Sequence, residues 1–354
     1  MHRTRPTTLA HLALSLALLI LLAGCTNPAQ PRLRAGSLPF PGLLTLYEPF
    51  DAENFDSHSY GMPPLFKDGS KGIVYTEYGG FIDVAHLRWT VDWGWYYYQR
   101  AQRALAKEKT NLTLPTDKFT RFTVEFDYPD HWHTLSKEQR ETLADEIALR
   151  LGQELAFLQG HWHEIATFYG YKTTVIISEY ESAFAYCDTI SHIVGLHVLE
   201  DAIREYKKND FDQAVTVAFF DHLHRLKPYS VDDTYAAIDA VEGRWWTGRR
   251  LMRRQLDLGL QGEPIRPWLI PNREGDPGRY GEPLIAPGLH DLDPPAYRDF
   301  ATIRIKPRIF EAGAIRAAAN TDDDAINPYV HFPLIMNDIR QRHYIENGHG
   351  TAQP

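Results

Sequence analysis

Hydrophobic side chains recur every three or four residues between Ser136 and Gly170, which is the period of one buried helix face. The apolar positions are Leu143, Ile147, Leu151, Leu155, Leu158, Trp162 and Ile165. Ser136 and Gln139 form a capping-box pair at the start of this pattern. Beside the apolar stripe runs a stripe of small residues, Ala148, Gly152, Ala156 and Gly160, which continues to His163 and Thr167. We therefore predict one long helix that a partner element approaches closely, with His163 facing that element.

The other patterns also predict helices for most of the chain. Helical spacing covers Phe81–Lys107, Asp188–Tyr206, Asp212–Leu223, Val231–Leu258 and Leu334–His343. Alternating residues predict strands at Phe119–Tyr128 and Ala301–Phe310. From Gly262 onward the chain is dense in Pro and Gly, which regular helices do not tolerate. We expect a mainly α fold, in which a helical body with a few short strands carries a Pro/Gly-rich C-terminal arm wrapped over it.

The first 24 residues have the order of a secretory signal. Arg3 and Arg5 supply a basic start, and an apolar run from Leu9 to Leu22 follows. Such a segment is removed on export, so it does not belong to the fold. The run is also shorter than the roughly 20 apolar residues that a membrane-spanning helix needs.

The segment "LAGC" that ends this run resembles a bacterial lipobox. The resemblance implies cleavage before Cys25 and a diacylglycerol on its sulfur, and two or three acyl chains give stable membrane anchoring. Thr26, in place of Asp, implies export to the outer membrane, with the protein facing the periplasm. The alternative is ordinary signal cleavage nearby, which would leave Cys25 as a free thiol.

Residues 25–42 are rich in Pro, Gly and Ala and lack periodicity, so we interpret them as a tether. This divides the chain into four parts: a signal peptide (1–24), a lipidated tether (25–42), a helical domain (43–261) and an arm packed on that domain (262–354). The composition is 44% hydrophobic and 12% aromatic, which is enough for a large core.

The charge of the chain argues against a nucleic-acid partner. The formal net charge is −9 from 37 basic and 46 acidic residues, and loss of Arg3 and Arg5 with the signal changes it to −11. Lipidation of Cys25 would leave Cys187 as the remaining cysteine, so the fold cannot rely on a disulfide. We expect Cys187 to be a small buried apolar residue; the alternative is a nucleophile, because His192 and several carboxylates lie near it in the sequence.

Adjacent His163 and Glu164 in "GHWHEIATFYGY" are the strongest chemical signal of the chain. In zinc peptidases a helical His binds the metal and the following Glu activates its water, while a second His stands one turn later. Thr167 occupies that later position here. The pair therefore predicts His163 as a metal ligand and Glu164 as a general base only if other segments supply the remaining ligands.

Two further segments offer such ligands. Asp83 and His86 share one face of their predicted helix, and Asp188 and His192 share a face of theirs. One ligand from each of several helices is how helical bundles assemble metal sites. We predict a divalent metal such as zinc, bound by His86, His163, and Glu181 or Asp188, with Asp83 and His192 as supporting or alternative ligands. The competing interpretation is that the aspartates cap helices, the histidines lie in the core and Glu181 pairs with an arginine.

Two other patterns carry less weight. Residues two apart on a helix diverge by roughly 200°, so neither His161 with His163 nor His222 with His224 is expected to bind one ion. The aromatic cluster comprises Trp89, Trp93, Trp95, Tyr96, Tyr97 and Tyr98. We expect this cluster to pack in the core; the alternative is a platform for sugar stacking.

The segments "GGFIDVAH", "HEIATFYGY" and "ESAFAYCD" resemble those of a family of bacterial lipoproteins classed as a domain of unknown function. The resemblance implies that these segments belong to one domain, and it implies no activity. Two hypotheses follow. The protein is either a periplasm-facing metal-dependent hydrolase or a non-catalytic envelope lipoprotein that binds a glycan, a lipid or a protein through an aromatic-lined cleft.

Overall fold

The computed structural model describes residues 30–32, 34, 48–60, 71–172, 179–205, 210–248, 250–270 and 281–346, and it confirms a mainly α fold. Its helices are α2 (Val84–Leu105), α3 (Lys137–Phe168), α4 (Asp188–Arg204), α5 (Phe211–Arg225), α6 (Val231–Ala240), α7 (Ala312–Ala318) and α8 (Pro328–Glu346). The predicted signal peptide and Cys25 lie outside the described residues. None of the helices in the described ranges is long and apolar enough to cross a membrane.

The strands form three small antiparallel sheets among the described residues. A hairpin pairs β1 (Ile73–Thr76) with β2 (Gly80–Asp83), and a second short hairpin pairs β5 (Trp246–Thr247) with β6 (Arg250–Leu251). The third sheet has the order β3 (Asn111–Pro115), β4 (Arg121–Phe126), β7 (Ala301–Lys306). The strands predicted at 119–128 and 301–310 are thus confirmed, and β7 brings the C-terminal region into a sheet with β4.

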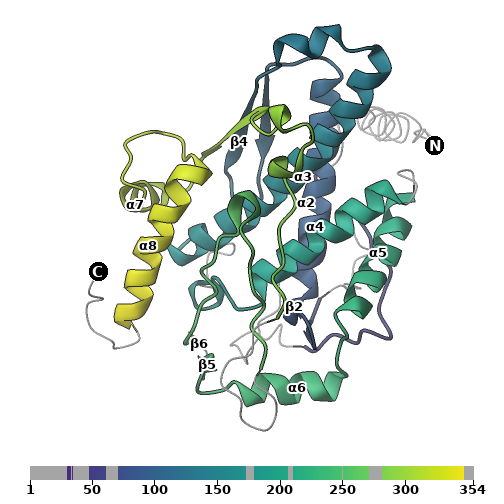
Figure 1. Cartoon of the computed structure of the whole chain (residues 1–354). Coiled ribbons are helices and arrows are strands. Elements are labelled where there is room, and N and C mark those ends of the chain that lie inside the picture. Colours follow the sequence, from purple (N-terminus) through teal and green to yellow (C-terminus); the bar gives the residue numbers. More distant parts are fainter. Residues whose placement is uncertain are drawn as a thin grey trace, which may run out of the picture.

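Helices α2, α3 and α4 pack against one another at the centre of the molecule (Figure 1). Glycines let them approach closely. A Cβ atom at Gly152 of α3 would lie 2.9 Å from the carbonyl oxygen of Gly94 in α2. A Cβ atom at Gly195 of α4 would lie 2.6 Å from the carbonyl oxygen of Leu87, also in α2. The close approach predicted along the small stripe of α3 is therefore confirmed, as is the Ser136 capping box.

Three predicted helix boundaries were wrong. The first helix begins at Val84 rather than Phe81, because residues 80–83 pair with β1. Helix α6 begins after Ser230 as predicted but ends at Ala240 instead of Leu258, because Gly243 turns the chain with a φ of 72° into the hairpin β5–β6. Helix α8 is longer than predicted and starts at Pro328, a residue that fits the first turn of a helix.

The aromatic cluster of α2 is buried in the core, as expected, with Tyr97 fully inaccessible to solvent. The main core also contains Ile303 and Ile305 of β7 and Phe332 of α8. The helical body and the C-terminal arm therefore share one hydrophobic core.

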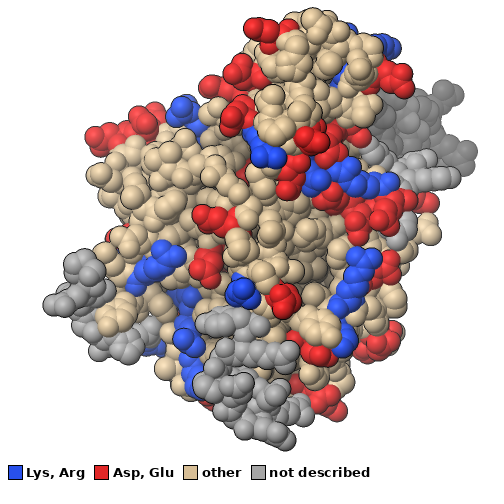
Figure 2. All heavy atoms as spheres, viewed as in Figure 1, with Lys and Arg blue, Asp and Glu red and all other residues tan. Residues whose placement is uncertain are grey.

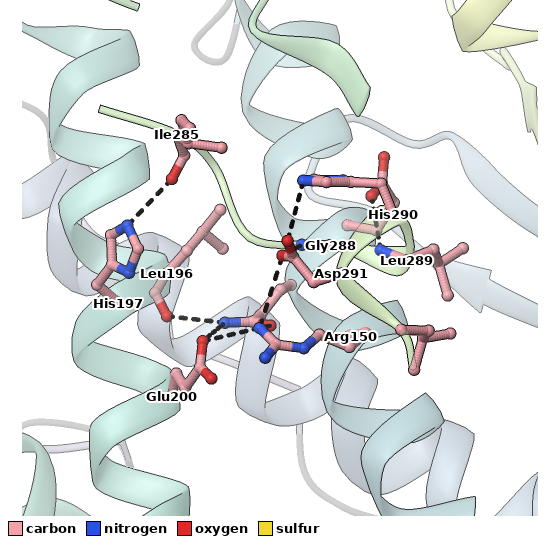
Figure 3. A network of polar contacts seen from close by, with 12 residues as sticks. Arg150, Leu196, His197, Glu200, Ile285, Gly288, Leu289, His290 and Asp291 are labelled. Atoms are coloured by element: carbon pink, nitrogen blue, oxygen red, sulfur yellow. Dashed lines mark hydrogen bonds and ion pairs between the residues drawn. The ribbon is translucent and has the colours of Figure 1, made fainter. Parts of the chain in front are cut away.

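Polar contacts fix the arm to α3 and α4 near the short helix η5 (Leu289–Asp291) (Figure 3). Arg150 of α3 forms an ion pair with Glu200 of α4 at 2.8 Å and lies 3.8 Å from Asp291 of the arm. Nε2 of His197 donates a hydrogen bond of 3.0 Å to the carbonyl oxygen of Ile285. These contacts hold the arm across two helices.

The N-terminal segment predicted as a tether touches the body at Arg34. Its guanidinium forms an ion pair of 2.6 Å with Asp92 of α2, and both side chains are buried. At Arg34 the chain is thus held against the helical body instead of acting as a free spacer.

On the face seen in Figure 2, acidic and basic side chains are intermingled over the surface.

Because α4 approaches α2 closely, we predict that a larger side chain at Gly195 destabilises the fold. Gly195→Ala places a methyl group against the backbone carbonyl of Leu87, which cannot move without shifting α2. We expect a loss of about 1–3 kcal/mol in the free energy of unfolding, measured by urea denaturation. Gly313→Ala is the matched control, because a Cβ atom there meets nothing within 4 Å. Equal effects of the two substitutions would contradict the packing argument.

The buried carboxyl of Glu154 on α3 should make the stability of the folded protein depend on pH. Burial between α3 and the arm raises the pKa of its carboxyl above the usual 4.5, although hydrogen bonds from Tyr329 Oη and the Leu289 N–H oppose the shift. Because the folded-state pKa is raised, this group stabilises the fold fully below about pH 4.5 and loses that contribution as the pH rises through the folded-state pKa.

Relative to the wild type, Glu154→Gln is therefore expected to become progressively more stable as the pH rises above 4.5. The slope is at most about 1.4 kcal/mol per pH unit, the value for one proton. Urea unfolding at a series of pH values measures it, with the exposed Glu53→Gln as control. A stability difference that does not vary between pH 4 and pH 8 would rule out the buried, raised-pKa carboxyl.

Candidate metal centre

His86 stands in the first turn of α2 and is held by the residue that caps this helix. Asp83 accepts a hydrogen bond of 2.8 Å from the Ala85 N–H through Oδ1, and its Oδ2 lies 2.8 Å from Nδ1 of His86. The backbone N–H of Asp83 donates to Ser191 Oγ of α4 at 2.8 Å. Asp83 is thus a helix cap, as the competing interpretation expected, and at the same time it orients His86.

His163 and Glu164 are fixed by different segments although they are neighbours on α3. Nδ1 of His163 lies 2.9 Å from Oδ2 of Asp117, in the turn between β3 and β4. Oε2 of Glu164 accepts a hydrogen bond of 2.7 Å from the backbone N–H of Phe184. Phe184 has a φ of 58°, a left-handed conformation that non-glycine residues seldom adopt, and this turn leads into α4.

The three motif segments converge around His86. Side-chain donor atoms of His86, His163 and Glu164 all lie within 4.8 Å of one another, and so do those of Asp83, His86 and Asp188. The rings of His86 and His163 are 6.2 Å apart between centroids and nearly perpendicular. These two groups, which share His86, could hold a metal ion.

Carboxylates engage the Nδ1 atoms of both imidazoles. Asp83 contacts Nδ1 of His86, and Oδ1 of Asp188 lies 3.5 Å from the same nitrogen. Asp117 contacts Nδ1 of His163. Within the described ranges no hydrogen bond reaches Nε2 of either ring. A carboxylate on one imidazole nitrogen is the usual support of a histidine whose other nitrogen binds a metal. The side chains of His86 and His163 are 18% and 23% exposed, so solvent reaches both.

Acidic side chains predominate in this cluster. The carboxylates of Asp83, Asp188 and Glu164 are all buried. Burial of the His86 imidazole opposes its positive charge, yet these three carboxylates raise its pKa to about 10. Burial, reinforced by the nearby Glu164, raises the pKa of Asp188 well above its ordinary value. Buried carboxylates in such number are stabilised by a cation, so the electrostatics favour a bound metal.

The remaining candidate ligands lie outside the two groups. Glu181 is exposed on η2 (Tyr180–Ser182) and belongs to neither group. His192 packs its ring 5.4 Å from that of His86, and its Nδ1 lies 2.7 Å from Thr90 Oγ1. Its Nε2 is buried without a hydrogen-bond partner among the described residues, and it faces Gly160 of α3. Burial and the neighbouring histidines lower the pKa of His192 well below its ordinary value, so the ring is neutral.

Two other expectations of the sequence are confirmed. Cys187 is fully buried, and burial together with Asp188 and Asp83 raises the pKa of its thiol well above the ordinary value, which disfavours a nucleophilic thiolate. His161 and His163 diverge as expected, because Nε2 of His161 donates to the carbonyl oxygen of Leu258 at 2.5 Å.

Asp117 and the Phe184 N–H are parts of the site that the sequence did not reveal. Asp117 lies 46 residues before His163, in a turn whose local pattern indicates only a chain reversal. The role of Phe184 depends on its backbone conformation, which no side-chain pattern encodes. A cavity of about 620 Å³ adjoins the site and is lined in part by Asp117 and Trp89. The Trp89 ring lies 6.0 Å from that of His163.

The comparisons with known proteins give a family without an activity. A family model described as "Protein of unknown function (DUF4056)" matches residues 50–258. This range includes His86, Asp117, His163, Glu164 and Asp188. No curated protein matches the chain significantly, and no solved structure does so either.

Proposed function

The chain belongs to the DUF4056 family of proteins of unknown function, and within it we propose that this protein is a metal-dependent hydrolase of the cell envelope. The observation that carries the proposal is the meeting of His86 and His163, from two helices, with Glu164 beside both and a carboxylate on the Nδ1 atom of each ring. Two histidines and one glutamate, with a coordination position left for a water molecule, are a common ligand set of catalytic zinc.

We assign Nε2 of His86, Nε2 of His163 and the carboxylate of Glu164 as ligands of one divalent ion such as zinc. This changes the role predicted for Glu164 from general base to ligand, because a carboxylate oxygen of Glu164 lies within 4.8 Å of a ring nitrogen of each histidine. Glu181 leaves the ligand set because it is exposed and belongs to neither group. Asp188 and Asp83 orient His86, and Asp117 orients His163.

A metal in this position would act as a Lewis acid on a water molecule or a substrate oxygen. The protein contributes a rigid frame, because the carboxylates that orient both imidazoles are themselves buried or nearly so. The competing function is a non-catalytic lipoprotein that binds a glycan, lipid or protein. The cavity beside His163, lined by Trp89 and Trp93, favours that function if the protein binds no metal.

Substitution of the ligands tests this assignment. His163→Ala and Glu164→Gln should each lower zinc affinity by at least about tenfold, because each removes one donor of a three-ligand set. Asp117→Asn should weaken binding about 10–100-fold while leaving the ligands in place. His222→Ala, which removes a histidine bound to Asp201 elsewhere, is the control and should bind zinc normally. Competition titration with a zinc chelator gives the affinities.

Two outcomes would change the proposal. If Glu164→Gln retains zinc at normal affinity and loses turnover, Glu164 is the general base and not a ligand. If wild type and His163→Ala contain equally little zinc, the metal site and the hydrolase are both wrong, and the two substitutions would only lower thermal stability through a disturbed helix contact.

We further propose that the protein is a lipoprotein, anchored at Cys25 to the outer membrane and facing the periplasm. Cys25→Ala should then leave an unprocessed precursor that incorporates no radiolabelled palmitate, because the acylated sulfur is absent. Cys187→Ala, at the other cysteine of the chain, should be labelled like the wild type. Labelling and membrane fractionation that are unchanged in Cys25→Ala would remove the lipoprotein assignment.

A further inference from the structure

The cavity beside the candidate metal centre has a distinct chemical character. Its volume is about 620 Å³, and it lies between α2, the turn that joins β3 to β4, and the residues that follow β7. It shares Asp117 with the support of His163, and it shares Trp89 with the aromatic packing around that histidine. A molecule in this cavity would therefore lie against two residues that contact His163.

Basic side chains surround this cavity although the chain is acidic overall. Arg32, Arg121 and Arg308 are among its lining residues, in a chain of net charge −9. Asp117 is the one acidic side chain among the described lining residues, and its Oδ2 is bound to His163. The cavity thus has an excess of positive charge.

Two of these arginines have no acidic partner among the described residues. Neither Arg121 nor Arg308 forms an ion pair with any residue in the described part of the chain, and both are exposed. Arg121 of β4 also lies directly opposite Lys306 of β7, two residues before Arg308. Like charges in directly opposed cross-strand positions are destabilising. An anion held there would relieve this repulsion.

Aromatic side chains provide the apolar part of the cavity. Trp89 and Trp93 are buried in α2 and line the cavity. Phe119, in the turn between β3 and β4, is 77% exposed and has a φ of 48°. An exposed large apolar side chain in a left-handed conformation is unfavourable in a free loop, and contact with a ligand would offset part of that cost.

We propose that the substrate of this protein is a small anionic molecule with an apolar or planar portion, such as a phosphate ester. Its negative group binds Arg121 and Arg308, its apolar portion packs on Trp89 and Trp93, and its reacting bond lies toward His163. Arginine recognises such groups through paired, charge-assisted hydrogen bonds. This inference names the substrate class of the proposed hydrolase and rests on that function, but recognition of the anion itself requires no metal.

Phenyl phosphate is the probe, with phenol as its uncharged analogue, and binding is measured by isothermal titration calorimetry on protein treated with a chelator. The metal is removed so that the phosphate reports on the arginines alone. We expect phenyl phosphate to bind at least about tenfold more tightly than phenol. The double variant Arg121→Ala/Arg308→Ala should lose this preference, and Arg308→Lys should retain most of it because the charge remains.

Arg304→Ala is the matched control. Arg304 is an exposed arginine of β7 that lies opposite Thr123 and does not line the cavity. Its removal takes away one positive charge, as each of the two substitutions in the double variant does, and should leave binding unchanged. Equal weakening by Arg304→Ala and by the double variant, or binding of phenol as tight as that of phenyl phosphate, would overturn the proposal.

A second ligand separates the two sources of such an anion. Dihexanoyl phosphatidic acid, used at concentrations where it stays monomeric, represents a lipid headgroup with acyl chains, whereas phenyl phosphate represents a soluble ester. Tighter arginine-dependent binding of the first assigns a lipid substrate, and tighter binding of the second assigns a soluble one. If neither binds in an arginine-dependent way, the proposal is wrong, even when zinc affinity follows His163 and Glu164 and the metal site stands. Conversely, arginine-dependent binding in a protein without zinc affinity would keep the anion site and reject the hydrolase.

Discussion

The close contact of α2 with α3 and α4 is the constraint on which the rest of the molecule depends. At Gly152 and Gly195 no room exists for a methyl group between one helix and the backbone of the next. Backbones this close allow the functional side chains near the helix ends to meet across the interface. Without that approach, His86 and His163 would be separated by the width of ordinary apolar side chains.

The candidate metal centre combines this close packing with an unusual concentration of buried charge. Asp83, Asp188 and Glu164 lie in a region where isolated carboxylates are costly, and each is held by a backbone N–H from a helix start or from the turn before one. Ala85 supplies the N–H for Asp83 and Phe184 supplies it for Glu164. Backbone donors of this kind stabilise anionic carboxylates. The fold thus gathers three buried carboxyl groups around His86, which is the kind of ligand environment that a cation site requires.

The anion-binding cavity has the opposite character although it touches the same site through Asp117. Arg121 comes from β4 of the body, and Arg308 comes from the residues after β7 in the C-terminal arm. The arm therefore has a role beyond covering the core, because pairing of β7 with β4 brings Arg308 beside Arg121. A negative cluster beside a positive cavity suits an anionic substrate bound next to a metal ion.

The sequence alone determined what local spacing encodes. The long helix with its Ser136 cap, the buried aromatic cluster of α2 and the strand at Arg121–Phe126 follow from short-range periodicity. The candidates His86, His163 and Asp188 also came from the sequence, because paired His and carboxylate residues on predicted helix faces are recognisable without coordinates. The end of α6 at Ala240 was missed because a glycine turn and a hairpin with strands of only two residues leave almost no periodic signal in the sequence.

Only the tertiary structure decided how those candidates combine. It brought His86 beside His163 from segments far apart in the chain, left Glu181 outside on the surface, and paired His163 with Asp117 across a sheet turn. Contacts of this kind depend on the distance between helix axes and on strand pairing, which a linear sequence does not specify residue by residue. The sequence therefore identified the chemistry-bearing residues, whereas the packing of α2, α3 and α4 selected which of them share a site.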